Sequence, residues 1–326
     1  MRSARRQVCR IAAAAALALP GVTFAQQDAY PSKPVRIVVG FPAGSSTDVA
    51  TRVIAQRLGQ GLGQQFVVEN RAGASSNIAA RAVTGSPADG YTLFVGTIAN
   101  TINATLQAST SVDISKEMVP VAMMGSVPNI LVAHPSLGVD TLAQLIAKAK
   151  AEPGKITFAS SGNGTSPHLS GELLAYMAGV RMLHVPYKGS SPAVVDLLAG
   201  QVLTMFGPAS TVLPHIREGK LKALASTGLT RASSMPDLPT VDELGLKGFE
   251  TSVWFGINAP LNTPAPVIEK LAAAVNAAQD SAEVQAQFKT QGIEGVRAGP
   301  GSYAALIRSE TDKWARVIKA AGVQSQ

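Results

Sequence analysis

Cysteine is almost absent from this sequence, and its absence excludes two kinds of stabilising site. Cys9 is the only cysteine among 326 residues, and it precedes an apolar run at residues 11–19. That position does not suit a lipid-modified cysteine, and removal of the leading segment would leave no thiol. Disulfide bonds and cysteine-ligated metals are therefore excluded, and an oxidising, extracytoplasmic compartment suits the remaining chain.

Charged residues are also scarce, at 15% of the chain, and much of the positive excess lies at one end. The formal net charge is +7, and it falls to +3 without residues 1–25, because that segment holds four arginines and no acid. The remaining charge does not indicate a nucleic-acid partner. With 46% hydrophobic residues, the chain can form one or two complete cores.

The apolar run near the start is short. Residues 11–19 follow four arginines, and a small-residue exit ends at Ala25. A membrane-spanning helix needs about 20 apolar residues, so the alternative of a membrane anchor is disfavoured. We predict a signal peptide at residues 1–25 that is cleaved after Ala25, and hence a periplasmic protein.

Motifs of catalysis, metal binding and nucleotide binding are missing as well. The sequence has no Gly-x-Ser-x-Gly elbow and no phosphate-binding Gly-Lys-Ser/Thr loop. Its four histidines, His134, His168, His184 and His215, lack the spacing of metal ligands. We therefore expect no enzyme, no metal and no cofactor, and we expect His168 to make a structural hydrogen bond.

The residues that are present alternate between short apolar runs and helical patterns, which predicts an α/β protein with parallel strands. Strands are expected at residues 35–39, 66–70, 91–95, 119–133, 156–159, 182–185, 203–206, 221–226 and 253–259. Helices are expected at residues 48–62, 77–84, 141–151, 167–178, 192–199, 266–282, 282–291 and 300–321.

A change of pattern divides the chain into two expected domains. The long β-rich stretch at residues 119–133 marks a crossing into a second α/β series, and the C-terminal block has helices but few strands of its own. We predict that residues 26–125 plus 251–326 form domain one and residues 126–250 form domain two. The two crossings then make a hinge, with the ligand site in the cleft between the domains.

Three apolar runs end in loops of small, hydroxyl and amide residues that then open a helix. These loops are residues 41–48, 96–101 and 160–166, and Ser190 with Pro192 begins a further helix in the same way. The first turn of a helix has free backbone N–H groups and a partial positive charge, so it can hold an anion without lysine or arginine. Single loops of this kind are ordinary helix caps, but together they predict a carboxylate clamp.

Several short motifs, in this order and spacing, closely resemble the Bug-type solute-binding proteins of tripartite tricarboxylate transporters. The resemblance covers essentially the whole chain after the leader. The motifs are YPSKPVR at residues 30–36, FPAG at 41–44, VENRAGA at 68–74, DGYTL at 89–93, SGNGTSPH at 161–168, HVPYKG at 184–189 and PTV at 239–241.

This resemblance implies a periplasmic binding protein of the type II, Venus-flytrap arrangement, in which each domain is a mainly parallel sheet flanked by helices. It also implies that one carboxylate of the ligand is bound by backbone N–H groups and hydroxyls of the loops. The implied ligand-binding residues are Ala43, Gly44, Ser45, Thr97, Asn100, Ser161, Asn163, Thr165 and Ser166.

Three further residues complete the candidate site. Tyr187 and Trp254 lie beside a loop and a domain crossing, where a stacking or hydrogen-bonding role competes with core packing. Gly207 stands where many relatives carry aspartate, so a ligand ammonium would lose its natural partner. The resemblance therefore implies a dicarboxylate or an aromatic carboxylate that has no amino group.

The leading hypothesis is a monomeric receptor that passes a small carboxylate to a membrane permease or to a sensor protein. The alternative is a secreted serine hydrolase that acts on a small ester or amide with Ser161 or Ser166 as the nucleophile. A third possibility, the effector domain of a transcription regulator, is disfavoured because a leader occupies the place of a DNA-binding motif.

Overall fold

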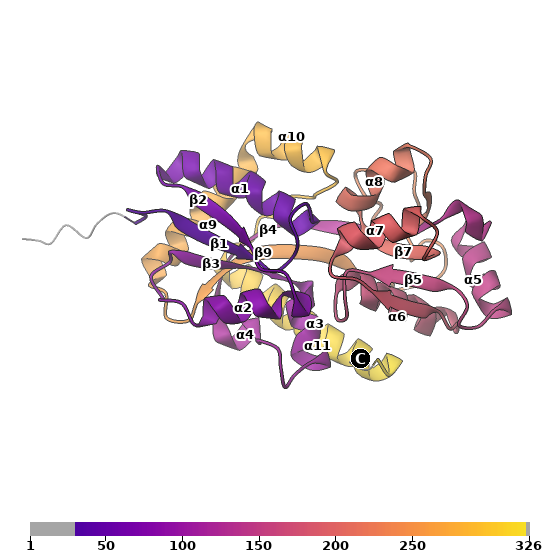
Figure 1. Ribbon diagram of the computed structural model, residues 1–326. Helices are drawn as coiled ribbons and strands as arrows, with labels where there is room; N and C mark the ends of the chain where they lie inside the picture. The colour runs from indigo at the N-terminus through magenta and orange to yellow at the C-terminus, as the bar shows by residue number, and fades with distance from the viewer. Residues whose placement is uncertain (1–29, 324–326) are drawn as a thin grey trace, which may run out of the picture.

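A curled, mixed β-sheet forms the centre of the computed structural model, which describes residues 30–323 (Figure 1). Its strands follow the order β2-β1-β3-β9-β4-β7-β5-β6, and β8 pairs with β4. The strands are β1 (Val35–Val39), β2 (Phe66–Asn70), β3 (Thr92–Thr97), β4 (Met118–Ala133), β5 (Thr157–Ser160), β6 (Leu183–Pro186), β7 (Thr204–Pro208), β8 (Lys222–Ser226) and β9 (Ser252–Pro260).

Strand β4 passes through the whole molecule and divides the sheet into two halves. Its residues 118–128 pair antiparallel with β9, and its residues 129–133 pair antiparallel with β7 and β8. We call the part with β1, β2, β3 and β9 the first half, and the part with β5, β6, β7 and β8 the second half. The outer strands of both halves are parallel, as the alternation of strands and helices predicts.

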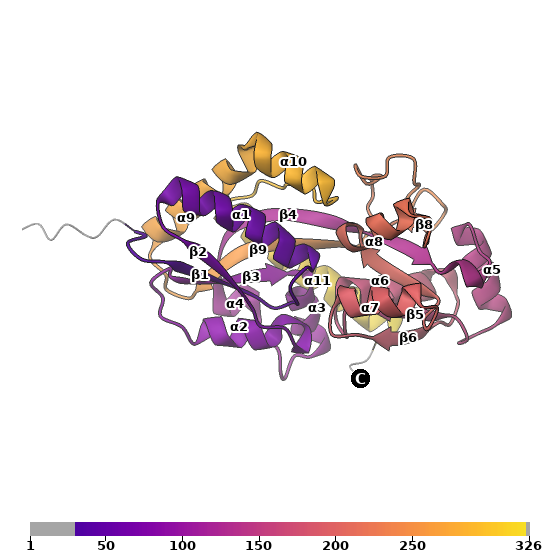
Figure 2. The same ribbon diagram turned by 45° about the horizontal axis from the view of Figure 1, so that its top comes forward.

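Helices cover both faces of the first half. On one face α1 packs on α9, and on the other face α11 packs on α3 (Figures 1 and 2). Each face has its own apolar core, and Trp314 and Tyr303 of α11 are the largest side chains that are completely buried. The helices are α1 (Ser46–Leu62), α2 (Asn77–Thr84), α3 (Ile98–Leu106), α4 (Ile114–Glu117), α9 (Ala265–Asp280), α10 (Ala282–Thr290) and α11 (Pro300–Ala321).

The second half is layered in the same way. One face buries α5 and α6 against Phe158, Phe206 and Phe249, and the other buries α7 and α8 (Figure 2). The sequence pattern does not predict α8, which begins after Pro208 and contains Pro214. The helices are α5 (Leu142–Ala151), α6 (Ser166–Ala178), α7 (Ser190–Leu198) and α8 (Ala209–Arg217), and short 3-10 turns cover Ala74–Ser76 and Pro135–Leu137.

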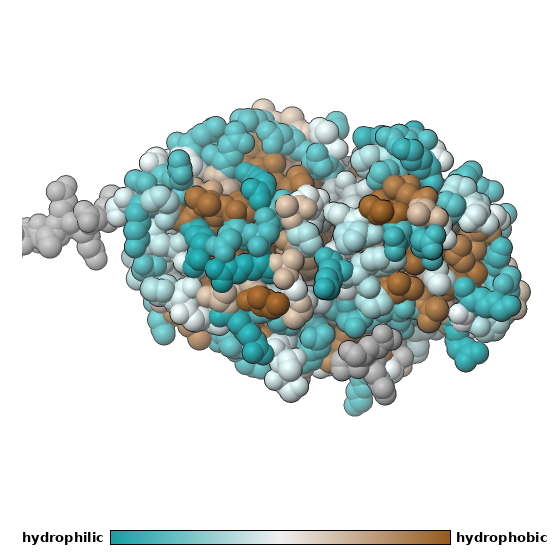
Figure 3. All heavy atoms as spheres, in the orientation of Figure 1, coloured by the Kyte–Doolittle hydropathy of each residue, from teal (hydrophilic) through white to brown (hydrophobic). Residues whose placement is uncertain are grey.

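This architecture confirms the predicted α/β class. Exposed apolar side chains such as Val67, Tyr176 and Val195 are scattered over both halves, and the face in Figure 3 is mostly polar. Within residues 30–323, no helix is both long and apolar enough to span a membrane. The predicted signal peptide at residues 1–25, and Cys9 within it, lie outside the described residues.

Candidate functional site

Five helices begin around one small cavity between the two halves. Each follows directly after the carboxyl end of a strand: α1 after β1, α3 after β3, α6 after β5, α7 after β6 and α8 after β7. The carboxyl ends of the strands of both halves therefore face the same cleft, which is the usual ligand position in open α/β sheets. The cavity is lined by Phe41, Ser45, Ser46, Thr47, Thr97, Ile98, Ala99, Ser161, Thr165, Ser166, Pro167, Ser190, Pro208 and Val253.

The cavity is lined by backbone groups and small polar side chains and not by charged side chains. No lysine, arginine, histidine or acidic residue is among the described residues that line it. The helices α6, α7 and α8 start without a side-chain cap, so the N–H groups of their first turns have no capping partner. Free N–H groups and the positive ends of helix dipoles both favour a bound carboxylate.

A buried carboxylate of the protein itself organises the start of α1. Asp48 is 2% exposed and accepts hydrogen bonds from Gly44 N (2.9 Å), Asn70 Nδ2 (2.8 Å) and Arg52 Nε (3.0 Å). Burial alone raises the pKa of Asp48, but the hydrogen bonds from Arg52, Gly44 and Asn70 outweigh it and hold the pKa below its ordinary value. The Gly44 N–H is thus already occupied.

The first predicted loop lines the cavity with one of the three residues expected from it. Ala43 and Gly44 are exposed and are not among the described residues that line this cavity or the one next to it. Ser45 does line the cavity, and its Oγ caps α1 by accepting a hydrogen bond from Asp48 N (3.3 Å). Ser46 and Thr47 follow it at the cavity wall, and within residues 30–323 no protein acceptor binds their backbone N–H groups. These two donors were not among the predicted residues.

The second loop forms a capping box. Asn100 Oδ1 accepts a hydrogen bond from Thr97 N (3.0 Å), and Thr97 Oγ1 accepts one from Ala99 N (3.3 Å). Thr97 lines the cavity, whereas Asn100 is fully buried and does not. Asn100 therefore shapes the start of α3.

The third loop brings three hydroxyls to the cavity. Ser161 Oγ is hydrogen-bonded to Ser190 Oγ (2.7 Å), and Ser166 Oγ accepts from Asn129 Nδ2 (2.7 Å). Thr165 Oγ1 donates to the carbonyl of Gly162 (2.6 Å). The hydroxyls of Ser161 and Ser166 thus contact other polar side chains and no histidine, so the nucleophile of the hydrolase alternative has no base beside it.

A second cavity of about 290 Å³ opens next to the first and shares Phe41 and Ser161 with it. Asn163 and Tyr187 line this second cavity, together with Lys188. The Tyr187 hydroxyl donates to Asp196 Oδ2 (2.7 Å), and burial together with that carboxylate raises the pKa of Tyr187 to about 12. Tyr187 is therefore neutral at ordinary pH.

Two other predicted residues lie away from both cavities. Trp254 is 3% exposed, packs edge-on against Tyr303 and donates to Glu310 Oε2 (3.4 Å). Its neighbour Val253 lines the cavity instead, because successive residues of a strand face opposite sides. Gly207 is buried on β7, where a Cβ atom would lie 2.3 Å from Val212 Cγ1, so the close packing of α8 requires glycine there.

The halves touch directly across the cleft. Asn103 Nδ2 of α3 donates to the carbonyl of Gly164 (3.1 Å), and Ser75 Oγ donates to the carbonyl of Asn163. Gly164 has a φ of 71°, and a Cβ atom would lie 2.2 Å from Asn103 Oδ1, so only glycine permits this approach. The enclosed cavity measures about 30 Å³, room for about one water molecule. A ligand larger than a water molecule therefore does not fit this cavity, and we call this arrangement of the two halves the closed form.

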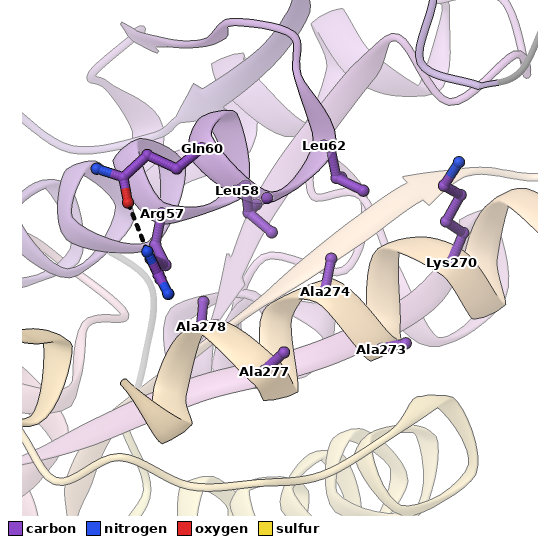
Figure 4. A pocket seen from close by; sticks show the side chains of 10 residues that line it. Arg57, Leu58, Gln60, Leu62, Lys270, Ala273, Ala274, Ala277 and Ala278 are labelled. Carbon is purple, nitrogen blue, oxygen red and sulfur yellow. Dashed lines mark hydrogen bonds between the residues drawn. The ribbon is translucent and has the colours of Figure 1, made fainter. Parts of the chain in front are cut away.

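A larger hollow of the surface lacks these features. A groove of about 500 Å³ between α1 and α9 is lined by alanines of α9 and by Arg57, which donates to Gln60 Oε1 (2.7 Å) (Figure 4). No helix begins there. In the described part of the chain, histidine, cysteine and acidic side chains do not gather into a group that could hold a metal ion.

Comparison with known proteins identifies a family and several relatives of this chain. Residues 50–323 match the model of a family described as tripartite tricarboxylate transporter family receptor. The chain is 40% identical over 299 residues to the protein BugT of Bordetella pertussis. The aligned region covers 91% of this chain and 92% of BugT.

Solved structures are similar over nearly their whole length. A protein of R. palustris solved with adipate is 35% identical with a TM-score of 0.87, covering 90% of this chain and 99% of the other. MatC from Rhodopseudomonas palustris, solved with bound malate, is 31% identical with a TM-score of 0.84, covering 89% and 100%.

Proposed function

Because the chain belongs to the family of tripartite tricarboxylate transporter receptors, we propose that it binds a small organic carboxylate between its two halves and delivers it to a membrane permease. The observation that supports this proposal is that five helices begin around one cavity, and that no charged side chain is among the described residues that line this cavity. Each charge-assisted hydrogen bond to a carboxylate contributes roughly 1.5 to 3 kcal/mol, which offsets the desolvation of the ligand.

The proposed binding residues come from both halves. Ser45, Ser46, Thr47 and Thr97 belong to the first half, and Ser161, Thr165, Ser166 and Ser190 belong to the second. Asn163 and Tyr187 would meet the part of a longer ligand that extends into the second cavity. Opening would then separate residues 26–125 and 251–326 from residues 126–250 as two domains.

We further propose a ligand without an amino group, either a dicarboxylate or an aromatic carboxylate. A buried ammonium group is best compensated by a carboxylate partner, and no aspartate or glutamate is among the described residues that line the two cavities. The adipate and malate in the similar structures both lack an amino group. The protein would act as a monomer in the periplasm after removal of residues 1–25, serving a permease or a sensor protein.

Calorimetry and thermal shift with a panel of ligands test the proposal. Adipate, malate and benzoate represent the proposed classes, glutamate adds an amino group, and adipamide is a neutral control of the same shape as adipate. We expect saturable binding of at least one carboxylate and no binding of adipamide. For a ligand held in the first cavity alone we expect little change in affinity with added salt, because no cationic side chain lines that cavity, whereas a ligand that reaches Lys188 in the second cavity should bind more weakly as salt is added. Absence of binding across a broad carboxylate panel would refute the proposal.

A further inference from the structure

Two histidines that line neither cavity make hydrogen bonds to the loop between β5 and α6 and to the end of β5. The rings of His168 and His184 are stacked with centroids 4.0 Å apart, and the ring of Phe158 stacks on His184 at 4.9 Å. His168 is on α6 and His184 is on β6, so the stack joins two elements that flank the loop. The carboxylate proposed above would meet the opposite side of this loop.

Each histidine fixes a different backbone N–H of the loop. Gly164 N donates to His168 Nδ1 (3.1 Å), so Nδ1 of that ring carries no proton. His184 Nε2 is hydrogen-bonded to Ser160 Oγ (2.6 Å), and the same Oγ accepts a hydrogen bond from Gly162 N (3.1 Å). The N–H groups of both glycines thereby have acceptors within the protein.

This arrangement determines which groups of the loop remain for a ligand. With Gly162 and Gly164 occupied, Ser161 is directed to the cavity, where it meets Ser190. The turn also leads directly into Thr165 and Ser166 at the start of α6. Ser160 itself is fully buried, so its contact with His184 serves the loop and not a reaction at the surface.

The ionisation of both rings agrees with this role. Burial, with a smaller contribution from His184, lowers the pKa of His168 to about 3, and burial lowers the pKa of His184 to about 4. Both histidines are therefore neutral at pH 7, as an acceptor at Nδ1 of His168 requires.

We propose that His168 and His184 are positioning residues for ligand binding, which set the conformation of residues 160–166 through Gly164 N and Ser160 Oγ. The proposal rests on the proposed function for its effect on affinity, but its effect on the loop can be measured without any ligand. A purely structural role of the stack predicts that any replacement of a ring has the same effect.

Amide side chains distinguish a positioning role from a purely structural role of the ring stack. Each amide offers a hydrogen-bond acceptor at a distance from the backbone that is set by the length of the side chain. In His168→Asn, Oδ1 replaces Nδ1, whereas in His168→Gln the oxygen lies one bond further out. In His184→Gln the amide reaches the position of Nε2, whereas in His184→Asn it falls short. All four variants lose the ring stack equally, so each pair is its own matched control.

The first readout is hydrogen exchange of residues 160–168 in the ligand-free protein. We expect His168→Gln to speed exchange of the Gly164 amide, and His184→Asn to speed exchange of the Gly162 amide. His168→Asn and His184→Gln should preserve protection. Equal exchange within each pair overturns the proposal, whether or not a ligand is known.

The second readout is the Kd for adipate or malate, with the melting temperature as a check on folding. We expect about tenfold weaker binding in His168→Gln and His184→Asn and wild-type affinity within about threefold in the rescuing variants, the range of one lost hydrogen bond. If the wild type binds neither acid, the proposed function is in question, while hydrogen exchange still decides the positioning role. If the wild type binds and all four variants bind alike, the positioning role is wrong.

Discussion

The side-chain amide of Asn103 donates a 3.1 Å hydrogen bond to the carbonyl of Gly164, and so connects α3 of the first half with the loop that precedes α6 of the second half. The same amide nitrogen donates to the carbonyl of Ala99 (2.7 Å), which fixes its orientation. Asn103 is fully buried in this closed form, and separation of the two halves would break the bond, because its partners belong to different halves.

Asn103→Leu should shift the protein toward the open form. The variant keeps the side-chain volume but leaves the Gly164 carbonyl without its donor on closure, a cost of about 1 to 3 kcal/mol. We expect a larger radius of gyration in small-angle X-ray scattering and about tenfold weaker ligand binding. Thr110→Ala, at an exposed position just beyond α3, is the control. Unchanged scattering and affinity in Asn103→Leu would show that this bond does not stabilise closure.

Ser46→Pro should remove one proposed ligand donor without disturbing α1. Ser46 is the first residue of α1, where proline is well tolerated, and Ser45 before it has the extended backbone that proline requires. We expect calorimetry to show about tenfold weaker carboxylate binding with little change in melting temperature, since a charge-assisted bond is lost.

The matched control for that variant is Ala282→Pro at the first residue of α10. This helix also begins after a serine with extended backbone, Ser281, and lies outside the cleft. If both variants bind the ligand like the wild type, the N–H of Ser46 is not a ligand donor.

Asp48→Asn should destabilise the protein at neutral pH. The pKa of Asp48 is lower in the folded state than in the unfolded chain, so its charged form adds stability above the unfolded value and loses it as the pH falls through the folded value. We expect urea unfolding at pH 7 to show a loss of about 1 to 3 kcal/mol, shrinking toward low pH. Asp312→Asn on the exposed side of α11 should cost little, and an equal loss in both variants would contradict the argument.

The buried His168 should make the protein less stable in mild acid. Its pKa is about 3 in the folded state and 6.5 in the reference state, so between these values the unfolded chain binds the additional proton and stability falls as the pH falls. From pH 6.5 to pH 4.5 the expected loss from this residue is about 2 to 3 kcal/mol. Urea unfolding of His168→Asn should show a shallower pH dependence, and an identical slope would contradict the low pKa.

The sequence predicts most of the fold because the residues that begin and end its strands and helices are visible locally. Strand β1 and helix α2 have the predicted bounds, since an apolar run and a helical pattern are each set off by glycine or serine. Helix α8 is not predicted because Pro208 and Pro214 interrupt the pattern, and its burial of Val212 and Leu213 depends on contacts with distant strands.

The candidate site is predicted in part, for a different reason. Hydroxyls at helix starts, such as Thr97 and Ser166, are visible in the sequence and do line the cavity. Successive side chains of β9 face opposite sides of the sheet, and Val253, not Trp254, lies on the side of the cleft. Because both sides of this strand are buried and apolar, the sequence alone does not reveal which set of side chains faces the cleft. The contact between His168 and His184 joins different elements and leaves no local signal.

The return of the chain into the first half determines the order in which the protein can fold. Gly96 of β3 pairs with Gly256 of β9, so about 160 residues must follow β3 before its neighbour exists. Until then β3 has an unpaired edge, and the face that α11 covers stays exposed to water. A chain leaving the ribosome therefore cannot complete its first half before β9 and α11, near its C-terminus, have been synthesised.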